Sequence, residues 1–227
     1  MLENLGSGAT IAGYGDEAYL TWGFPIYRTA YGGLTDQHGE TLIDTIHQQV
    51  AEELEHYRSS SSRPRRNTGS TNPIDAPNPA APSTLLSLFR LDVHSDPDIL
   101  EGADIDRVRQ IYMDNLPSTT DRHRSVQWQL FLLADAEVLA AVARGDSWVK
   151  LCDPLYKPEN YTIKNSRMGR GLWFLGYIWM TTRSLLCLWN SLEREELALL
   201  APPLTGQKFS EVWNGYMAAV LPDRRPL

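Results

Sequence analysis

The nearly continuous apolar run at residues 126–134 limits most strongly how this 227-residue chain can fold. The apolar side chains of this run include Trp128, Leu130, Phe131, Leu132 and Leu133. A strand with apolar residues on both faces lies inside a sheet that is covered on both sides. We therefore expect a central strand here. A helix follows, capped by Asp135, running through Arg144 and closed by Gly145.

Four other segments predict strands. Apolar and polar residues alternate at 19–31 and 84–94, and short apolar segments at 148–152 and 172–180 also read as strands. Pro25 has no N–H to donate to a neighbouring strand, so we expect the first strand to lie at an edge or to contain a bulge.

Helical spacing of apolar residues predicts a helix at 40–57, a helix that begins after Asp104 and ends before Pro117, and helices at 182–200 and 209–220. Thr182 is the expected cap of the third of these helices. Residues 156–170 are polar and lack a regular pattern, which indicates irregular structure.

The order of these elements favours an α+β fold. Strands and helices alternate, but several strand pairs are joined by segments short enough for an antiparallel connection. We expect a mixed or mainly antiparallel sheet with helices packed against it, and a doubly wound α/β arrangement is the alternative. The length suits a single hydrophobic core, so we predict one domain over residues 1–227.

Residues 57–83 differ from the rest of the chain and predict a disordered insertion loop. This Ser- and Pro-rich segment holds five of the fourteen prolines and shows no periodic pattern. Four arginines against Asp75 give it a charge of +3, whereas the whole chain carries −7. The prediction is a basic arm on an acidic body, either a solvated insertion or a segment that contacts phosphates.

The acidic charge and the missing motifs exclude several classes of protein. A chain at −7 has no field to attract duplex DNA, so we expect no DNA partner. Motifs for phosphate loops, dinucleotide binding, zinc hydrolysis and serine hydrolysis are absent, so we expect no cofactor. The two cysteines and five histidines lack metal-ligand spacing, which predicts no metal site.

The hydropathy pattern predicts a cytoplasmic protein that neither enters nor crosses a membrane. The first residues show no basic start followed by an apolar run, so we expect no signal peptide. The most apolar stretch, 172–192, is interrupted by polar residues and Arg183, which argues against a membrane span.

Charged residues gather at and after the strand predicted for 84–94. Arg90, Asp92 and His94 share one face of that strand. Five carboxylates follow, at Asp96, Asp98, Glu101, Asp104 and Asp106. The last two suit a helix start, where the helix dipole stabilises negative charge. Asp98 and Glu101 would lie on one side of a helix, which suits a pair in which one carboxylate acts as a base and the other binds a cation. Helix capping explains such a cluster of carboxylates equally well.

Two segments, TWGFPIYRTAYG at 21–32 and LFRLDVHSDPDILEGADIDRVRQIY at 88–112, show a resemblance to known proteins. Residues 131–142 and 179–189 fit the same pattern, so the resemblance covers most of the chain outside 57–83. In these segments the chain resembles a large group of fungal proteins, most of which lack an assigned function. The members of similar size with an assigned activity are arginine-containing cyclodipeptide synthases, which make cyclic dipeptides from aminoacyl-tRNA.

The resemblance implies an aminoacyltransferase of fungal secondary metabolism. Its partners would be arginyl-tRNA and a second aminoacyl-tRNA, and its product a diketopiperazine. The D-x-x-E motif of those enzymes corresponds to Asp98 and Glu101, the only such match here, as catalytic residues. The predicted substrate-binding residues are Arg28, Arg90, Asp92 and His94, with the arginines contacting phosphates of the tRNA acceptor end.

Two other functions fit the same sequence. One is a tailoring isomerase or cyclase of secondary metabolism that acts on a free small molecule in an apolar pocket. The other is a non-catalytic interaction protein whose seven tryptophans and ten tyrosines mostly fill the core.

Overall fold

A five-stranded sheet forms the centre of the protein. The computed structural model describes residues 22–61, 81–115, 130–165, 169–172, 174–192 and 196–201. The sheet has the order β2-β1-β3-β4-β7, with β1 at Trp22–Arg28, β2 at Phe89–His94, β3 at Phe131–Ala134, β4 at Trp148–Cys152 and β7 at Tyr177–Thr181. β1 runs parallel to β2 and β3, whereas β4 runs antiparallel to β3 and β7. The sheet is mixed, which confirms the predicted α+β fold.

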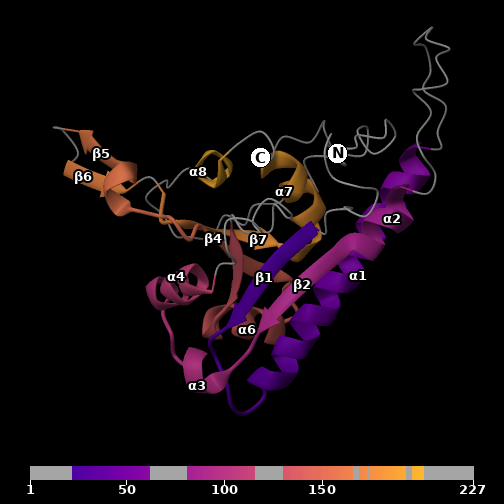
Figure 1. Cartoon of the computed structure of the whole chain (residues 1–227), viewed down its shortest axis with the longest axis horizontal. Helices are drawn as coiled ribbons and strands as arrows, with labels where there is room; N and C mark the ends of the chain where they lie inside the picture. Colours follow the sequence, from indigo (N-terminus) through magenta and orange to yellow (C-terminus); the bar gives the residue numbers. More distant parts are fainter. Residues whose placement is uncertain are drawn as a thin grey trace, which may run out of the picture.

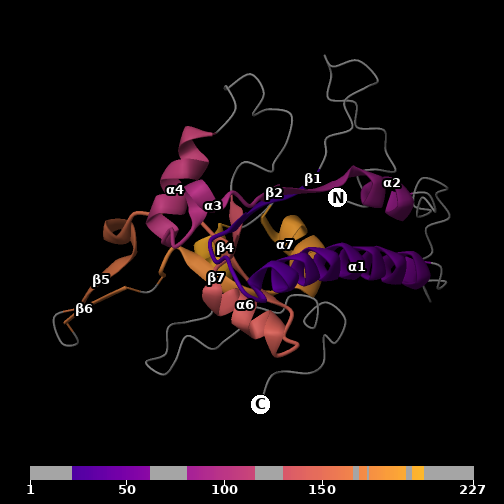
Figure 2. The same ribbon diagram turned by 90° about the horizontal axis from the view of Figure 1, so that it is seen from below.

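Helices cover both faces of this sheet (Figure 1 and Figure 2). One face carries α1 (Thr35–Ser61), α6 (Ala136–Ala143) and α7 (Leu185–Leu192). The other face carries α3 (Pro97–Leu100) and α4 (Ile105–Asp114). The other described elements are α2 (Ala81–Leu88), which packs on α1, α8 (Leu197–Leu200), the 3-10 helices η4 (Pro158–Tyr161) and η5 (Thr182–Ser184), and a hairpin of β5 (Thr162–Asn165) and β6 (Gly169–Leu172).

The larger core lies between the sheet and α1, α6 and α7. The alternation predicted for the first strand holds, because Trp22, Phe24 and Ile26 are all buried on this side. Trp189 of α7 packs edge-on against Trp22 and Phe24, at ring-centroid distances of 5.8 and 5.6 Å. Each such buried side chain stabilises the fold by about 1.5–3 kcal/mol.

A smaller core lies under α4. It contains Tyr27, Phe131, Leu133 and Cys152 from the sheet and Val108, Ile111 and Tyr112 from α4. Phe131 and Leu133 face this core, whereas Leu132 and Ala134 face the larger one. β3 is therefore buried on both faces and central in the sheet, as its apolar run predicts.

Several local predictions are confirmed by the structure. The strand 148–152 has the predicted bounds. Asp104 caps α4 by accepting a hydrogen bond from the Arg107 N–H, and Asp135 caps α6 by accepting one from the Val138 N–H. Gly145 has a φ of +88° after α6, in the left-handed region that glycine adopts without strain.

Other local predictions are wrong. Residues 84–88 belong to α2, so the second strand begins only at Phe89. The ends of the predicted loop, 57–61 and 81–83, are helical. Residues 158–165 and 169–172 form η4 and the two strands of a hairpin instead of irregular structure, and the last strand begins at Tyr177.

The helix predicted for 182–200 is broken into η5, α7 and α8. Thr182 does not cap it, because its hydroxyl faces two acceptors instead, Gln49 Oε1 at 2.6 Å and Ser147 O at 3.1 Å. These partners lie on α1 and before β4, so the hydroxyl joins segments that are distant in sequence.

Pro25 lies on a central strand, contrary to the expectation of an edge. It pairs with Asp92 of β2, whereas the pairing of β1 with β3 begins only at Ile26. At Pro25 the strand therefore has a described neighbour on one side only. The missing N–H is tolerated at this position for the same reason that proline is tolerated at sheet edges.

Some predictions fall on residues that the structure does not describe. These are the helix 209–220, residues 126–129 of the central strand and residues 62–80 of the insertion loop. None of the described helices is long and apolar enough to cross a membrane. Cys152 and Cys187 are both free thiols.

A buried carboxyl group, Glu53 of α1, joins this helix to the start of α7. It is only 2% exposed and accepts hydrogen bonds from the backbone N–H groups of Leu186 and Cys187. No described residue forms a hydrogen bond with its Oε2 atom. Burial raises the pKa of Glu53 to about 7, against the lowering effect of those two hydrogen bonds and of nearby Arg183.

Glu53 is therefore expected to make stability depend on pH. The folded state holds the proton more tightly than the unfolded state, whose pKa is about 4.5. The stabilising contribution is full below pH 4.5 and is lost as pH rises through 7, a change of about 3 kcal/mol. In E53Q, urea unfolding between pH 4.5 and 8 should lack this slope. D44N, which removes an exposed carboxylate elsewhere on α1, should keep it; equal slopes in E53Q and the parent protein would contradict the prediction.

Candidate functional site

The carboxyl ends of β1, β2 and β3 meet at one edge of the sheet. After β1 the chain enters α1 on one face, and after β2 it enters α3 and α4 on the other. β2 and β3 lie on opposite sides of β1 in the sheet. The chain therefore runs from β1 to the strand on one side and then crosses to the strand on the other side. Sheets with parallel strands bind ligands outside the carboxyl ends of the strands at such a reversal.

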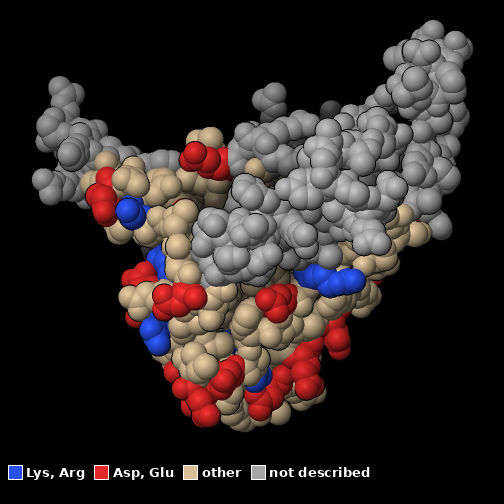
Figure 3. Space-filling view, viewed as in Figure 1, with Lys and Arg blue, Asp and Glu red and all other residues tan. Residues whose placement is uncertain are grey.

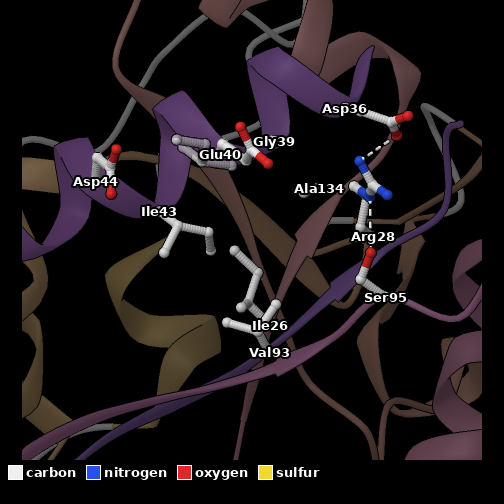
Figure 4. A pocket seen from close by; sticks show the side chains of 11 residues that line it. Ile26, Arg28, Asp36, Gly39, Glu40, Ile43, Asp44, Val93, Ser95 and Ala134 are labelled. Atoms are coloured by element: carbon white, nitrogen blue, oxygen red, sulfur yellow. Dashed lines mark hydrogen bonds and ion pairs between the residues drawn. The ribbon is translucent and has the colours of Figure 1, made fainter. Parts of the chain in front are cut away.

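A pocket of about 610 Å³ lies at this edge, between α1 and the ends of β1 and β2 (Figure 4). Its volume is in the range of small-molecule sites. Its lining combines apolar side chains with four charged ones and consists of Ile26, Arg28, Asp36, Gly39, Glu40, Leu42, Ile43, Asp44, Val93, Ser95 and Ala134.

The charge of this pocket is mostly negative. Asp36, Glu40 and Asp44 are spaced four residues apart on α1 and therefore follow one stripe of the helix. Figure 3 shows that carboxylates gather over the narrow end of the molecule, where α3 and the start of α1 lie. The pocket suits a ligand with a cationic group, since carboxylates accept paired hydrogen bonds from a guanidinium.

Arg28 is the cation of the pocket, and its position is set by four contacts. Its Nε donates to Ser95 Oγ at 2.9 Å and its Nη1 to Asp36 Oδ1 at 2.7 Å. The guanidinium lies 4.4 Å from the ring centroid of Tyr31, whose hydroxyl donates to Arg28 O. At Gly39 a Cβ would stand 3.1 Å from Arg28 Cδ, so glycine leaves room for this side chain. The described residues provide no partner for Nη2, which can bind an anion.

The opposite face of the sheet carries a second polar group beside Arg28. His94 Nε2 lies 2.9 Å from Asp92 Oδ2, and the His94 ring stacks on Tyr27 at a centroid distance of 4.4 Å. Burial, with a smaller effect of Asp92, raises the pKa of Tyr27 to about 12, so its hydroxyl stays protonated at neutral pH. The predicted pair Asp92 and His94 is thus brought together, but outside the lining of the pocket.

Arg90 is not brought to this edge. It lies near the amino end of β2, four residues and about 13 Å along the strand from His94. Its guanidinium donates to the backbone oxygens of Ser87 and Phe89. These hydrogen bonds hold the Arg90 side chain at the end of α2, away from the other predicted substrate-binding residues.

Asp98 and Glu101 lie on the exposed helix α3, which follows β2 at the same edge of the sheet. Asp98 is inside the helix, whereas Glu101 is the C-cap with extended backbone, so the expected helical spacing holds only in part. The Gly102 N–H donates to Thr29 O at 2.9 Å, which ties the residue after Glu101 to the end of β1. Neither carboxylate has an ion pair or hydrogen-bond partner among the described residues, and neither lines the pocket.

Sequence reasoning missed the three carboxylates of α1. Their four-residue spacing in a helix that directly follows a strand was the available signal. The same spacing is common on solvated helix faces. The sequence therefore could not distinguish a binding site from a solvated face, and only the position of the helix against Arg28 does so.

Lys150 is a second buried charged group that the sequence pattern did not reveal. Its Nζ donates to Asp135 Oδ2 at 2.6 Å and to Glu137 Oε2 at 2.8 Å, and lies 4.7 Å from the ring centroid of Trp179. Burial alone would lower the pKa of Lys150, but the bonds to both carboxylates raise it above its ordinary value. A lysine that stays charged is a poor nucleophile, so we assign it to holding the start of α6.

Within the described ranges, no three His, Cys, Asp or Glu side chains are grouped as metal ligands. Comparison of the chain with family models, with curated proteins and with solved structures gives no match. The assignment of the candidate site is therefore based on its geometry alone.

Proposed function

We propose that this protein is a tRNA-dependent cyclodipeptide synthase, which makes an arginine-containing diketopiperazine from aminoacyl-tRNA in the cytoplasm. One observation supports this function above others: the pocket at the carboxyl ends of β1 and β2 combines three carboxylates with one arginine. Asp36 is already paired with Arg28, so Glu40 and Asp44 are the carboxylates that suit the guanidinium of an arginyl group. The Nη2 of Arg28, which bonds to no described residue, suits a phosphate of the tRNA acceptor end.

The reaction needs a base and correct orientation more than activation of the ester. The α-amine of one aminoacyl group attacks the ester carbonyl of the other. An amide bond forms, the ester bond to the ribose breaks, and the amine proton passes through a base to the departing ribose oxygen. A second attack of the same kind closes the ring. Asp98 or Glu101 is the proposed base, because α3 presents both side chains to solvent beside the end of β1.

The pocket also supports a second candidate function. A carboxylate on Arg28 and an ammonium on Glu40 or Asp44 would bind a free amino acid as a zwitterion. That occupant would make the protein a tailoring enzyme that acts on a free small molecule. The two candidates differ in whether the carboxyl group of the substrate is esterified to tRNA.

The test is product formation from charged tRNA. Purified full-length protein is incubated with arginyl-tRNA and a mixture of other aminoacyl-tRNAs, and cyclic Arg-X products are sought by mass spectrometry. We expect a product that disappears after ribonuclease treatment. A product formed from free amino acids instead would support the second candidate, and no product from either source would refute both.

Variants of the pocket and of α3 separate binding from chemistry. E40Q/D44N should raise the KM for arginyl-tRNA about tenfold or more, because it removes charged hydrogen bonds to the substrate. E52Q/E55Q changes the net charge of the same helix equally but outside the pocket, and should leave KM unchanged. D98N or E101Q should lower kcat at least about 100-fold. Full activity in both α3 variants would remove the proposed base.

A further inference from the structure

We infer that His94 is a catalytic acid of the proposed reaction, which protonates the departing ribose oxygen, and that Asp92 is the residue that positions it. The inference rests on the proposed function for the identity of the substrate. It goes beyond the substrate binding expected of this pair from the sequence, because it assigns His94 to proton transfer.

The proposed reaction moves protons at two atoms. The attacking α-amine loses a proton as the amide bond forms, and the ribose oxygen gains one as the ester bond breaks. Asp98 or Glu101 is the proposed acceptor of the first proton. The ribose oxygen needs a donor, because an alkoxide is a poor leaving group at neutral pH. His94 gives one proton and the carboxylate takes one, and exchange of a proton through solvent restores both groups.

Asp92 engages one nitrogen of the His94 ring and leaves the other open. His94 Nε2 lies 2.9 Å from Asp92 Oδ2, so Nε2 donates to the carboxylate. No described residue forms a hydrogen bond with Nδ1. The His94 side chain is 34% exposed, so a substrate can reach this nitrogen. Serine hydrolases use the same arrangement, in which a carboxylate holds one nitrogen of an imidazole and the other nitrogen transfers the proton.

Packing against β1 fixes the plane of the His94 ring. Tyr27 is paired with His94 in the parallel register of β1 and β2, and the two rings stack at a centroid distance of 4.4 Å with an interplanar angle of 5°. Tyr27 is itself buried and packs edge-on against Phe131 and Tyr112, at centroid distances of 5.6 and 6.3 Å. A ring held on one face and at one nitrogen has little freedom to turn, so Nδ1 keeps a fixed direction.

His94 lies between the pocket and α3 along the chain. The next residue, Ser95, lines the pocket and accepts a hydrogen bond from Arg28 Nε. The residue after it, Asp96, caps α3, the helix that carries Asp98. One residue of a strand spans only about 3.3 Å. A substrate held by both the pocket and α3 would therefore cross the end of β2 beside His94.

Two other proton-bearing side chains of the sheet are less suited to this role. Burial raises the pKa of the Tyr27 hydroxyl to about 12, which makes it a weak acid. The Lys150 ammonium is buried and already donates to two carboxylates. Imidazole is the side chain that exchanges a proton most readily near neutral pH, and His94 presents one at the carboxyl end of β2.

Chemical rescue tests the inference in the full-length protein, with arginyl-tRNA and a mixture of other aminoacyl-tRNAs as substrates. H94A should lower kcat about 100-fold or more and change KM less than about threefold. Added imidazole should raise the kcat of H94A at least about tenfold, because it can enter the space left by the ring and donate the proton. The parent protein and a protein-free mixture receive the same imidazole, since free imidazole reacts with aminoacyl esters by itself.

Further variants separate proton transfer from packing. H94F keeps an aromatic ring to stack on Tyr27 but has no proton to donate, so it should be as inactive as H94A. D92A should lower kcat about tenfold without rescue by imidazole, because the native ring still fills the site, and D92E should recover part of this loss. H47A removes an exposed histidine of α1 outside the pocket lining and should keep the parent kcat. Far-UV circular dichroism and thermal melting check that every variant folds.

Three results would overturn the inference while the parent protein still makes the diketopiperazine. They are full activity of H94F, a loss in H94A that imidazole does not restore, and equal rescue of D92A and H94A. The proposed function fails in a different way: no product from charged tRNA with the parent protein itself would refute the reaction, and the role of His94 with it.

Discussion

Gly23→Ala is expected to remove most of the folding stability of this protein. Gly23 has a φ of +133°, which side chains other than glycine rarely adopt, and it pairs with Arg90 across β1 and β2. A Cβ atom there would overlap the backbone oxygen of Arg90 and lie 2.9 Å from its carbonyl carbon. Because the obstacle is backbone of the paired strand, β1 and β2 would have to separate.

The expected loss is more than about 4 kcal/mol, against a total stability of about 5–15 kcal/mol for a domain. Urea unfolding followed by far-UV circular dichroism measures it. Gly32→Ala is the matched control, because Gly32 also has a positive φ but a Cβ there meets nothing within 4 Å. This control should lose only about 1–2 kcal/mol, from backbone strain. The prediction fails if the two variants unfold within 1 kcal/mol of each other.

Arg109→Met is expected to destabilise the protein by about 2–4 kcal/mol. Arg109 is buried on α4 and connects three segments. Its Nε donates to Asp153 O at 2.9 Å, its Nη2 to Gly176 O at 3.1 Å and its Nη1 to Asp106 Oδ1 at 2.6 Å. Methionine would remove the Arg109 donor to Asp153 O, and would leave Gly176 O with only the Asp153 N–H at 2.9 Å; an unsatisfied buried group costs about 1–3 kcal/mol.

Lysine at position 109 should recover only part of the loss, because one ammonium group lacks the planar fork that reaches both backbone oxygens. The control is Arg107→Met on the same helix. Among the described residues, the exposed Arg107 side chain bonds only to Gln110, at 3.4 Å, so the loss in R107M should stay within about 0.5 kcal/mol. Urea unfolding of the three variants at pH 7 tests this order. Equal stability of R107M and R109M would show that Arg109 does not clamp α4 to the sheet.

The elements that the sequence predicted best are those whose determinants are near neighbours. Asp104 and Asp135 accept hydrogen bonds from N–H groups three residues ahead, so their caps are visible in a short stretch of sequence. The wrong predictions concern elements whose determinants are distant in sequence. Residues 84–88 alternate like a strand but are helical in α2, whose Leu85 oxygen accepts a hydrogen bond from Trp22, 63 residues earlier.

The candidate site was predictable only in part. Arg28 was expected at a ligand site from the family resemblance, and Asp92 and His94 from the charged face of their strand as well; the structure holds all three by close polar contacts. Arg90 shared the same strand face in the sequence pattern, but it lies at the wrong end of β2 to join them. The roles of Asp98 and Glu101 stay predictions.

Local spacing alone determined the apolar central strand, the caps of α4 and α6 and the alternation of the first strand, because backbone geometry and near neighbours suffice for each. Only the tertiary structure decided that the carboxylates of α1 and Arg28 share one pocket. The parallel pairing of β1 with β2 puts Ser95 beside Arg28, and α1 then crosses the same sheet edge. The order of strands depends on contacts between distant segments, so no local pattern of residues contains it.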